Sequence, residues 1–338
     1  MRGTVRTGSG PGLVGAFGLA GLLLVLPAAP AWAAARVDGM LPTAVRQFKA
    51  GQYRVARATF ERAVAQAPRD AALYQWLARC DLQLGNDDAA IDEAQEAVAL
   101  APGSSEYHRW LGRAYGEKAD RTRSFWLARK VKSEFEDAIR LDPSNIAARR
   151  DALDFYLNAP WIVGGGRDKA QAEVKAIAAL NPVEGDLARA EYLAQDRPQE
   201  AAVAYQRALA LKPSQPAPYF EAAAFYAGRN NGAALALVVS AAEGAVPADP
   251  RIDYYRGVEA ALSGRQLASG EAALRAYLHR APDADDMPSA ASAHLWLGRL
   301  YERADRPSAA VAEYLTVLKL DPGRRAARDA LRRLRPTS

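Results

Sequence analysis

The sequence has very little cysteine and histidine. Its 338 residues include one cysteine, Cys80, and three histidines. A single thiol excludes an internal disulfide. Its apolar neighbours predict a buried core residue, with a disulfide to another chain as the alternative. His108, His279 and His294 are scattered and lack the spacing of a zinc site. We therefore expect no metal site and no cofactor.

Recognisable catalytic motifs are missing as well. The sequence has no Gly-x-Ser-x-Gly elbow, which would expose a nucleophilic serine, and no His-Glu-x-x-His motif. Its aspartates and glutamates are spread along predicted helix surfaces at the density that solvation requires. These absences predict a protein that is not an enzyme.

Long apolar runs are confined to the N-terminus. Arg2 and Arg6 precede an apolar stretch at 13–26, and Ala31-Trp32-Ala33 has the small residues of a cleavage site. This pattern predicts a cleavable signal peptide over residues 1–35. The alternative is an uncleaved anchor, but the run is shorter than the roughly 20 residues that span a bilayer. The remaining chain has no candidate span, and its alanine- and arginine-rich composition looks bacterial, so we expect a periplasmic protein.

The positive charge of the chain is small. The formal net charge is +5, and loss of Arg2 and Arg6 with the signal peptide would leave about +3. Nucleic-acid binding usually shows as a concentrated basic patch. We therefore expect no nucleic-acid partner.

What the sequence does contain is a repeat, and residues 291–322 are its clearest copy. Gly298 and Ala310 are small, so two helices can approach closely at these points. Tyr301 and Tyr314 can fill the space between those helices, each contributing roughly 1.5–3 kcal/mol if buried. A hairpin of this kind leaves one apolar face uncovered, so copies of it must stack.

The spacing of this copy resembles the tetratricopeptide repeat family. A Leu-Gly pair is followed by Tyr301, then by Ala310 and Tyr314, and Pro322 closes a unit of about 34 residues. His294 stands where the family pattern has tryptophan, and Tyr314 replaces phenylalanine. The resemblance implies a solenoid of helical hairpins that binds other proteins or peptides.

The same landmarks recur along the rest of the chain. We predict an all-α, right-handed solenoid of about eight such hairpins over residues 36–338. An arginine-rich cap helix at 324–335 would give the stack a polar end. The predicted repeats lie near 37–68, 71–102, 105–143, 146–182, 184–213, 216–247, 250–282 and 291–322.

Two neighbouring copies are too long. The copy at 105–143 has seven residues more than the clearest one, which is about two helical turns, so we expect a longer helix pair. The copy at 146–182 has five more, which predicts a loop at 158–166. Both insertions should lie on one edge, and insertions in repeats often map to the binding face.

The apolar residues of these insertions have two possible roles. The loop contains Trp161, Ile162 and Val163, and the longer pair contains Phe125 and Trp126. Either the side chains fold back onto neighbouring helix ends, or they contact a partner. The second role is our hypothesis for partner binding.

A glycine-rich segment follows in the same loop. Gly164, Gly165 and Gly166, with Arg167 and Lys169, could bind a phosphate or carboxylate at the start of a helix. Alternatively, the glycines permit a tight loop and the aspartate at 168 caps the helix. The segment 155–170 resembles one in exported bacterial tetratricopeptide repeat proteins of undefined activity, which implies no chemistry.

The family resemblance also implies a concave surface built by the first helix of each hairpin. An arginine-bearing groove there would suit acidic or C-terminal peptide segments, and ordinary surface charge is the alternative. The groove positions would include Gln75, Arg79, Arg109, Arg113, Arg150, Phe220 and Arg299. The carboxylate clamp of chaperone-binding members needs lysine and asparagine where this chain has Leu41 and Val45, so that activity is not expected.

Together these patterns predict a non-catalytic periplasmic scaffold or adaptor for protein or peptide segments. One alternative is a module that binds an anionic glycan or phosphate through the glycine loop. Another is a structural component of an envelope assembly or export complex.

Overall fold

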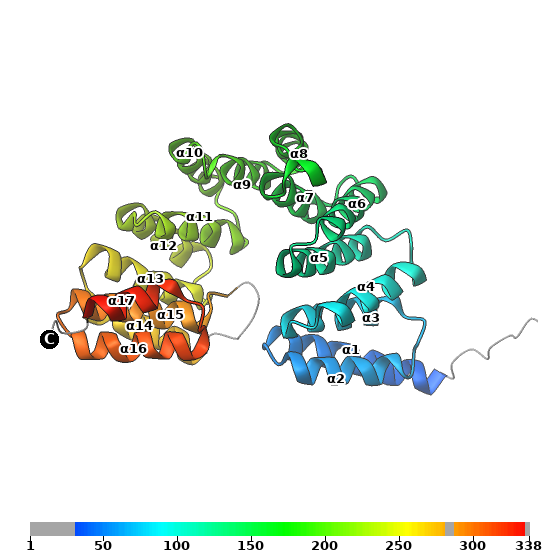
Figure 1. Cartoon of the computed structure of the whole chain (residues 1–338), viewed down its shortest axis with the longest axis horizontal. Coiled ribbons are helices and arrows are strands. Elements are labelled where there is room, and N and C mark those ends of the chain that lie inside the picture. Colours follow the sequence, from blue (N-terminus) through cyan, green and yellow to red (C-terminus); the bar gives the residue numbers. More distant parts are fainter. Residues whose placement is uncertain (1–30, 281–286, 335–338) are drawn as a thin grey trace, which may run out of the picture.

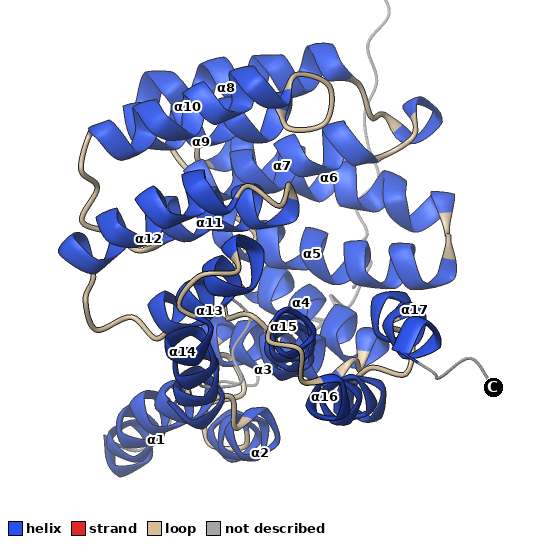
Figure 2. Ribbon diagram, turned by 90° about the vertical axis from the view of Figure 1, so that its left-hand side faces the viewer, coloured by secondary structure: helices blue, strands red, loops and turns tan. Residues whose placement is uncertain are grey.

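The protein is an array of α-helices. The computed structural model describes residues 31–280 and 287–334, in which there are seventeen α-helices, one short 3-10 helix and no strand (Figures 1 and 2). Nearly all of the predicted signal segment, 1–35, lies outside the described residues. The helices are α1 (Ala31–Lys49), α2 (Tyr53–Val64), α3 (Ala71–Leu84), α4 (Asp87–Leu100), α5 (Ser105–Thr122), α6 (Phe125–Leu141), α7 (Ile146–Asn158), η1 (Trp161–Val163), α8 (Arg167–Leu180), α9 (Pro182–Leu193), α10 (Pro198–Ala210), α11 (Ala217–Gly228), α12 (Gly232–Ala245), α13 (Arg251–Ser263), α14 (Leu267–Arg280), α15 (Ala290–Arg303), α16 (Pro307–Leu320) and α17 (Arg325–Leu334).

Successive helices pair into eight hairpins, which we number 1 to 8 from α1/α2 to α15/α16. The final helix, α17, packs on α16. Figure 1 shows the hairpins stacked into an arch, with hairpin 1 and hairpin 8 at its two feet. From α3 to α15 each odd-numbered helix also contacts the next odd-numbered one, and α5, α7 and α9 lie on the inside of the arch. The predicted all-α solenoid of helical hairpins with a C-terminal cap helix is therefore confirmed.

The small residues of the repeat let the two helices of a hairpin touch. A Cβ atom added to Gly298 would lie 2.5 Å from the ring of Tyr314, and one added to Gly112 would lie 2.5 Å from the ring of Phe135. These distances are well below van der Waals contact, so only glycine fits without movement of the ring. Tyr301 and Tyr314 are buried, as predicted. The same glycine position thus works in a regular hairpin and in an enlarged one.

The two insertions take the forms that their lengths predict. α5 has 18 residues and α6 has 17, whereas α15 and α16 have 14 each. The turn between α5 and α6 projects at the right of Figure 2. The loop between α7 and α8 contains η1, which packs against α6. Both insertions therefore lie on one edge of the arch, as predicted.

Cys80 is in the interior. It is fully buried in α3, in a cluster with Phe60 and Leu73, and burial raises the pKa of its thiol to about 12. A thiol without solvent access and with a raised pKa is unreactive at neutral pH. Its role as a small core residue is thus the one that the structure supports.

Candidate functional site

A pocket opens between hairpins 3 and 4. Its volume is about 560 Å³, and it is lined by α5, α6, α7 and the loop after α7. Part of its wall is apolar and includes Val131, Phe135, Phe155 and Val163. Ligand pockets commonly combine such an apolar lining with a few polar groups. This pocket, which we call the joint pocket, lies where the two insertions meet.

The glycine loop closes tightly beside the joint pocket. Gly164 has a φ of +103°, and a Cβ on Gly165 would lie 1.9 Å from the carbonyl oxygen of Ala159. The N–H groups of the three glycines all donate within the protein: Gly164 to Trp161 O, Gly165 to Pro160 O and Gly166 to Tyr156 O, at 3.0, 3.2 and 2.9 Å. The three glycine N–H groups of the anion-binding hypothesis are therefore already paired with backbone carbonyls.

The two cations of this segment are also engaged. Arg167 pairs with Asp196 at 2.8 Å and donates to the carbonyl oxygen of Tyr192 at 2.9 Å. The ammonium of Lys169 donates to the carbonyl oxygen of Gly164 at 3.1 Å. The N-cap of α8 is Gly166, so the aspartate at 168 lies in the first turn instead of capping the helix. The geometry supports a structural loop more than an anion site.

The apolar residues of the loop point in different directions. Val163 is 3% exposed and anchors the loop, whereas Trp161 is 84% exposed and Ile162 is 60% exposed. Nearby on α6, Phe125 and Trp126 are 61% and 64% exposed. The ammonium of Lys130 lies 4.1 Å from the centre of the Trp126 ring.

These four side chains are the exposed large apolar residues at the start of α6 and in the loop after α7. We call Phe125, Trp126, Trp161 and Ile162 the apolar rim. Clustered exposed apolar side chains often mark an interaction surface, whereas isolated ones are ordinary. The rim lies beside a pocket, and Phe125 belongs to the lining of that pocket.

Two of the predicted groove arginines pack on aromatic rings. The guanidinium of Arg79 lies 4.0 Å from the ring centre of Trp76 and 4.5 Å from that of Trp110. Arg113 approaches the same Trp110 ring at 4.6 Å. Such cation–π contacts are favourable, and they place both side chains in the packing of the inner helices.

Two more of the five predicted groove arginines, Arg109 and Arg150, are held by carboxylates, and the fifth, Arg299, lies 4.4 Å from the ring centre of Trp296. Arg109 pairs with Asp151 at 2.7 Å and with Glu106 at 3.1 Å. Arg150 meets three glutamates, Glu184, Glu191 and Glu221, at 3.3, 3.2 and 2.9 Å. Burial alone would lower the pKa of Arg150, but these glutamates raise it. The positive charges of Arg109 and Arg150 are therefore compensated by carboxylates of the protein itself.

Several aspartates lie together at the joint pocket. The sequence alone suggested only that they were dispersed charged residues on helix surfaces. Asp120 of α5 and Asp151 and Asp154 of α7 line it. Burial raises the pKa of Asp154, and the nearby charges of Asp151 and Asp120 raise it further, while a hydrogen bond from Asn158 opposes this. Spacings of three and four residues put Asp151, Asp154 and Asn158 of α7 on one helix face. That spacing could have revealed the cluster in the sequence.

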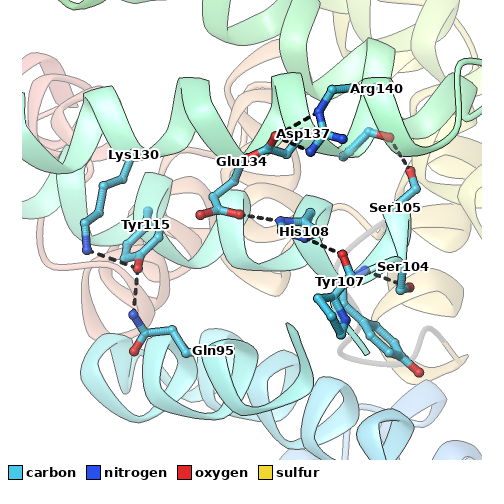
Figure 3. A network of polar contacts seen from close by, with 12 residues as sticks. Gln95, Ser104, Ser105, Tyr107, His108, Tyr115, Lys130, Glu134, Asp137 and Arg140 are labelled. Atoms are coloured by element: carbon cyan, nitrogen blue, oxygen red, sulfur yellow. Dashed lines mark hydrogen bonds and ion pairs between the residues drawn. The ribbon is translucent and has the colours of Figure 1, made fainter. Parts of the chain in front are cut away.

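A histidine cluster lies elsewhere on hairpin 3 (Figure 3). Ligand atoms of His108, Glu134 and Asp137 lie within 4.8 Å of one another, close enough to share a metal ion. However, His108 Nδ1 contacts Glu134 at 2.7 Å and Nε2 contacts the carbonyl oxygen of Pro102 at 3.1 Å. Asp137 pairs with Arg140 at 2.7 Å. The ring nitrogens and Asp137 thus already have protein partners.

None of the helices in residues 31–280 and 287–334 has both the length and the apolar composition to span a membrane.

Comparison with known proteins identifies the class of protein that this arch represents. Two family models, each described as tetratricopeptide repeat, match residues 47–114 and 255–325. Most of hairpins 3 and 4 lies between the two matches. Stacked hairpins with a glycine at the helix contact and two matches to one repeat define a helical-repeat solenoid. The chain is a tetratricopeptide repeat protein.

Solved structures of similar shape come from diverse proteins. A thermophilic tetratricopeptide repeat protein of Thermus thermophilus is 28% identical, with 56% of this chain and 98% of that chain covered and a TM-score of 0.48. A tetratricopeptide repeat protein of Parabacteroides merdae is 11% identical, covering 88% and 98%, with a TM-score of 0.50. The Cut9–Hcn1 hetero-tetramer of the APC/C gives 15% identity and a TM-score of 0.51, covering 88% of this chain and 55% of that one. No curated protein matches the sequence.

Proposed function

We propose that the protein is a non-catalytic scaffold that binds segments of other proteins at the edge formed by hairpins 3 and 4. Tetratricopeptide repeat solenoids are protein-interaction scaffolds, and this chain is one of them. The observation that carries the choice of surface is the apolar rim beside the joint pocket. Its two tryptophans are of the residue type that dominates binding energy in protein interfaces.

The stability that exposed apolar side chains forgo also supports the apolar rim as the binding surface. Burial of apolar surface is worth about 25 cal/mol per Å², so an exposed aromatic forgoes stability that a partner could supply. The aromatic residues that belong to the repeat itself are buried, as Tyr314 is in hairpin 8 and Phe135 in hairpin 3, so the exposed rim residues stand apart from them. The tight loop holds Trp161 and Ile162 outward because Val163 is anchored inside. We infer that the rim is kept for contact with a partner.

The test is partner capture from native cell envelopes by chemical crosslinking. Replacement of Trp161 and Ile162 with serine should remove most of the crosslinked partner and leave the melting temperature unchanged. The matched control is Leu237→Ser, which removes an equally exposed apolar side chain from α12 on another hairpin. Equal capture by both variants would reject the rim as the binding surface. A lower melting temperature of the double variant would assign the two residues a structural role.

We further propose that the protein acts in the periplasm, supported by the signal-peptide pattern of residues 1–35. The mass of the chain recovered from a periplasmic extract should correspond to cleavage after Ala33 or close to it. A full-length chain in the membrane fraction would instead indicate a retained anchor.

A further inference from the structure

Carboxylates outnumber basic groups in the joint pocket. The charged residues of its lining are Arg113, Glu117, Asp120, Arg123, Asp151 and Asp154. Asp151 is compensated by its ion pair with Arg109. Among the residues that the structure describes, no lysine or arginine forms an ion pair with Glu117, Asp120 or Asp154. These three negative charges therefore have no protein cation in direct contact.

The arrangement of the carboxylates follows from the two inner helices. Glu117 and Asp120 are three residues apart on α5, and Asp151 and Asp154 are three residues apart on α7, so each pair shares a helix face. α5 and α7 contact each other, and both pairs line the same pocket. Glu117, Asp120 and Asp154 are exposed to solvent in the free protein, and partial desolvation together with this crowding of like charge raises the pKa of Asp154.

The remainder of the pocket is suited to an apolar chain. Val131, Phe135 and Val163 are buried residues of its lining, and Phe155 lines it from α7. A lysine or arginine side chain packs its methylene groups along apolar surface and keeps its charged end among polar groups. The apolar lining residues of the pocket match the methylene groups of such a side chain, and its carboxylates match the charged end.

The rest of the concave surface disfavours an acidic partner segment. Beyond Asp154, the three glutamates around Arg150 carry the acidic surface toward hairpins 5 and 6. An acidic peptide would meet these carboxylates, whereas the arginines expected to attract it are paired or stacked on rings. Juxtaposed like charges disfavour such a partner.

We propose that the joint pocket receives the lysine or arginine side chain of a partner segment, whose flanking large apolar residues cover the apolar rim. The cation pairs with Asp154 and Asp120, and the aromatic rings of Phe125 and Trp161 contact the flanks. The proposal rests on the proposed function, since it names the chemistry of the segment that the scaffold binds.

The first experiment selects displayed random peptides on the wild-type protein. Selected peptides should be enriched in lysine or arginine next to aromatic or large aliphatic residues. Enrichment of aspartate, glutamate or free C-termini, the absence of any charge preference, or failure to enrich any peptide would overturn the proposal.

The second experiment measures the affinity of the best selected peptide for variants by fluorescence titration. Asp120→Asn with Asp154→Asn should weaken binding about tenfold at low salt, with a smaller effect at high salt, where charge pairs are screened. The control, Asp92→Asn with Glu96→Gln, removes two exposed charges from α4 and should leave affinity unchanged. Equal affinity for the two double variants contradicts the proposal.

Two further measurements separate loss of the cation contact from loss of folding. The acidic double variant should melt no lower than the wild type, because Asp120 and Asp154 form no ion pair, asparagine has nearly the same shape and repulsion between carboxylates is reduced. Replacement of the peptide's cation with norleucine should reproduce the loss on wild-type protein and cause no further loss on the Asp120/Asp154 variant. If Trp161→Ser with Ile162→Ser abolishes partner capture while the acidic variant binds normally, the proposed function stands and only the cation pocket is rejected.

Discussion

In hairpin 8, Tyr301 and Tyr314 are buried between α15, α16 and their neighbours, whereas in hairpins 3 and 4 the aromatic residues Phe125, Trp126 and Trp161 face solvent. The helix contact is the same in both regions, because Gly298 and Gly112 each meet a ring from the facing helix. The difference arises beyond that contact. Within the insertions Val163 packs against the neighbouring hairpin, whereas Phe125, Trp126 and Trp161 are not covered by any hairpin.

The largest effect should come from disturbing the contact that both regions share. Gly298→Ala places a methyl group against the fully buried ring of Tyr314, and overpacking of this kind costs about 1–3 kcal/mol. The melting temperature, followed by circular dichroism, should fall clearly. The control is Gly244→Ala in α12, where an added Cβ meets no atom within 4 Å. A similar melting temperature for both variants would show that the ring moves aside freely.

A somewhat smaller effect on the free energy of unfolding should distinguish the buried residue of the loop from the exposed one. Val163→Ala removes buried methyl groups and should lower the free energy of unfolding by about 1–2 kcal/mol. Trp161→Ala, two residues earlier and exposed, should change it by less than about 0.5 kcal/mol. Urea unfolding measures both. Equal destabilisation would mean that Trp161 packs in solution and that the rim is not free for a partner.

Binding of the selected basic peptide should depend on pH. The pKa of Asp154 is raised by burial and by neighbouring carboxylates, and the neutral acid no longer attracts a cation. Affinity should therefore fall as the pH is lowered, starting at a higher pH than the titration of an ordinary aspartate would give. Asp154→Asn should flatten this profile. The charged and polar groups around Asp154 are Asp120, Glu117 and Arg113 from α5, Arg123 after α5, Asp151, Arg150 and Asn158 from α7, and Glu191 from α9.

The smallest effect concerns the glutamates around Arg150. The pKa of Glu191 is raised to about 7, chiefly by burial, against the attraction of Arg150. The folded state therefore holds a proton at pH values where the unfolded chain, with a pKa near 4.5, has lost it. This contribution to stability is present at low pH and is lost as the pH rises through about 7. Glu191→Gln should reduce the change in melting temperature between about pH 5 and pH 8; an unaltered change would contradict the assignment.

Much of the fold could be predicted from sequence because its determinants are local. The spacing of Gly298, Tyr301 and Tyr314 marks one hairpin, and the same spacing recurs along the chain. The length of each insertion also distinguished a helix extension from a loop, since seven residues preserve the helical phase and five do not.

The character of the site was harder to predict because it depends on contacts between repeats. Arg150 pairs with Glu221, 71 positions away, and Arg109 pairs with Asp151, 42 positions away. Helix periodicity places each residue on a face but says nothing of the partner opposite. The different fates of Trp161 and Val163 likewise depend on the positive φ of Gly164, which turns the chain after η1.

The contact of α5 with α7 has a mechanical consequence. In a solenoid each hairpin touches mainly its neighbours, so the arch behaves as a row of hinges, and its span is the sum of their angles. The joint pocket opens at one of these hinges. If the proposed partner side chain occupies this pocket, it should alter the angle between hairpins 3 and 4, and a small change of angle near the middle of the row is magnified at the two feet of the arch.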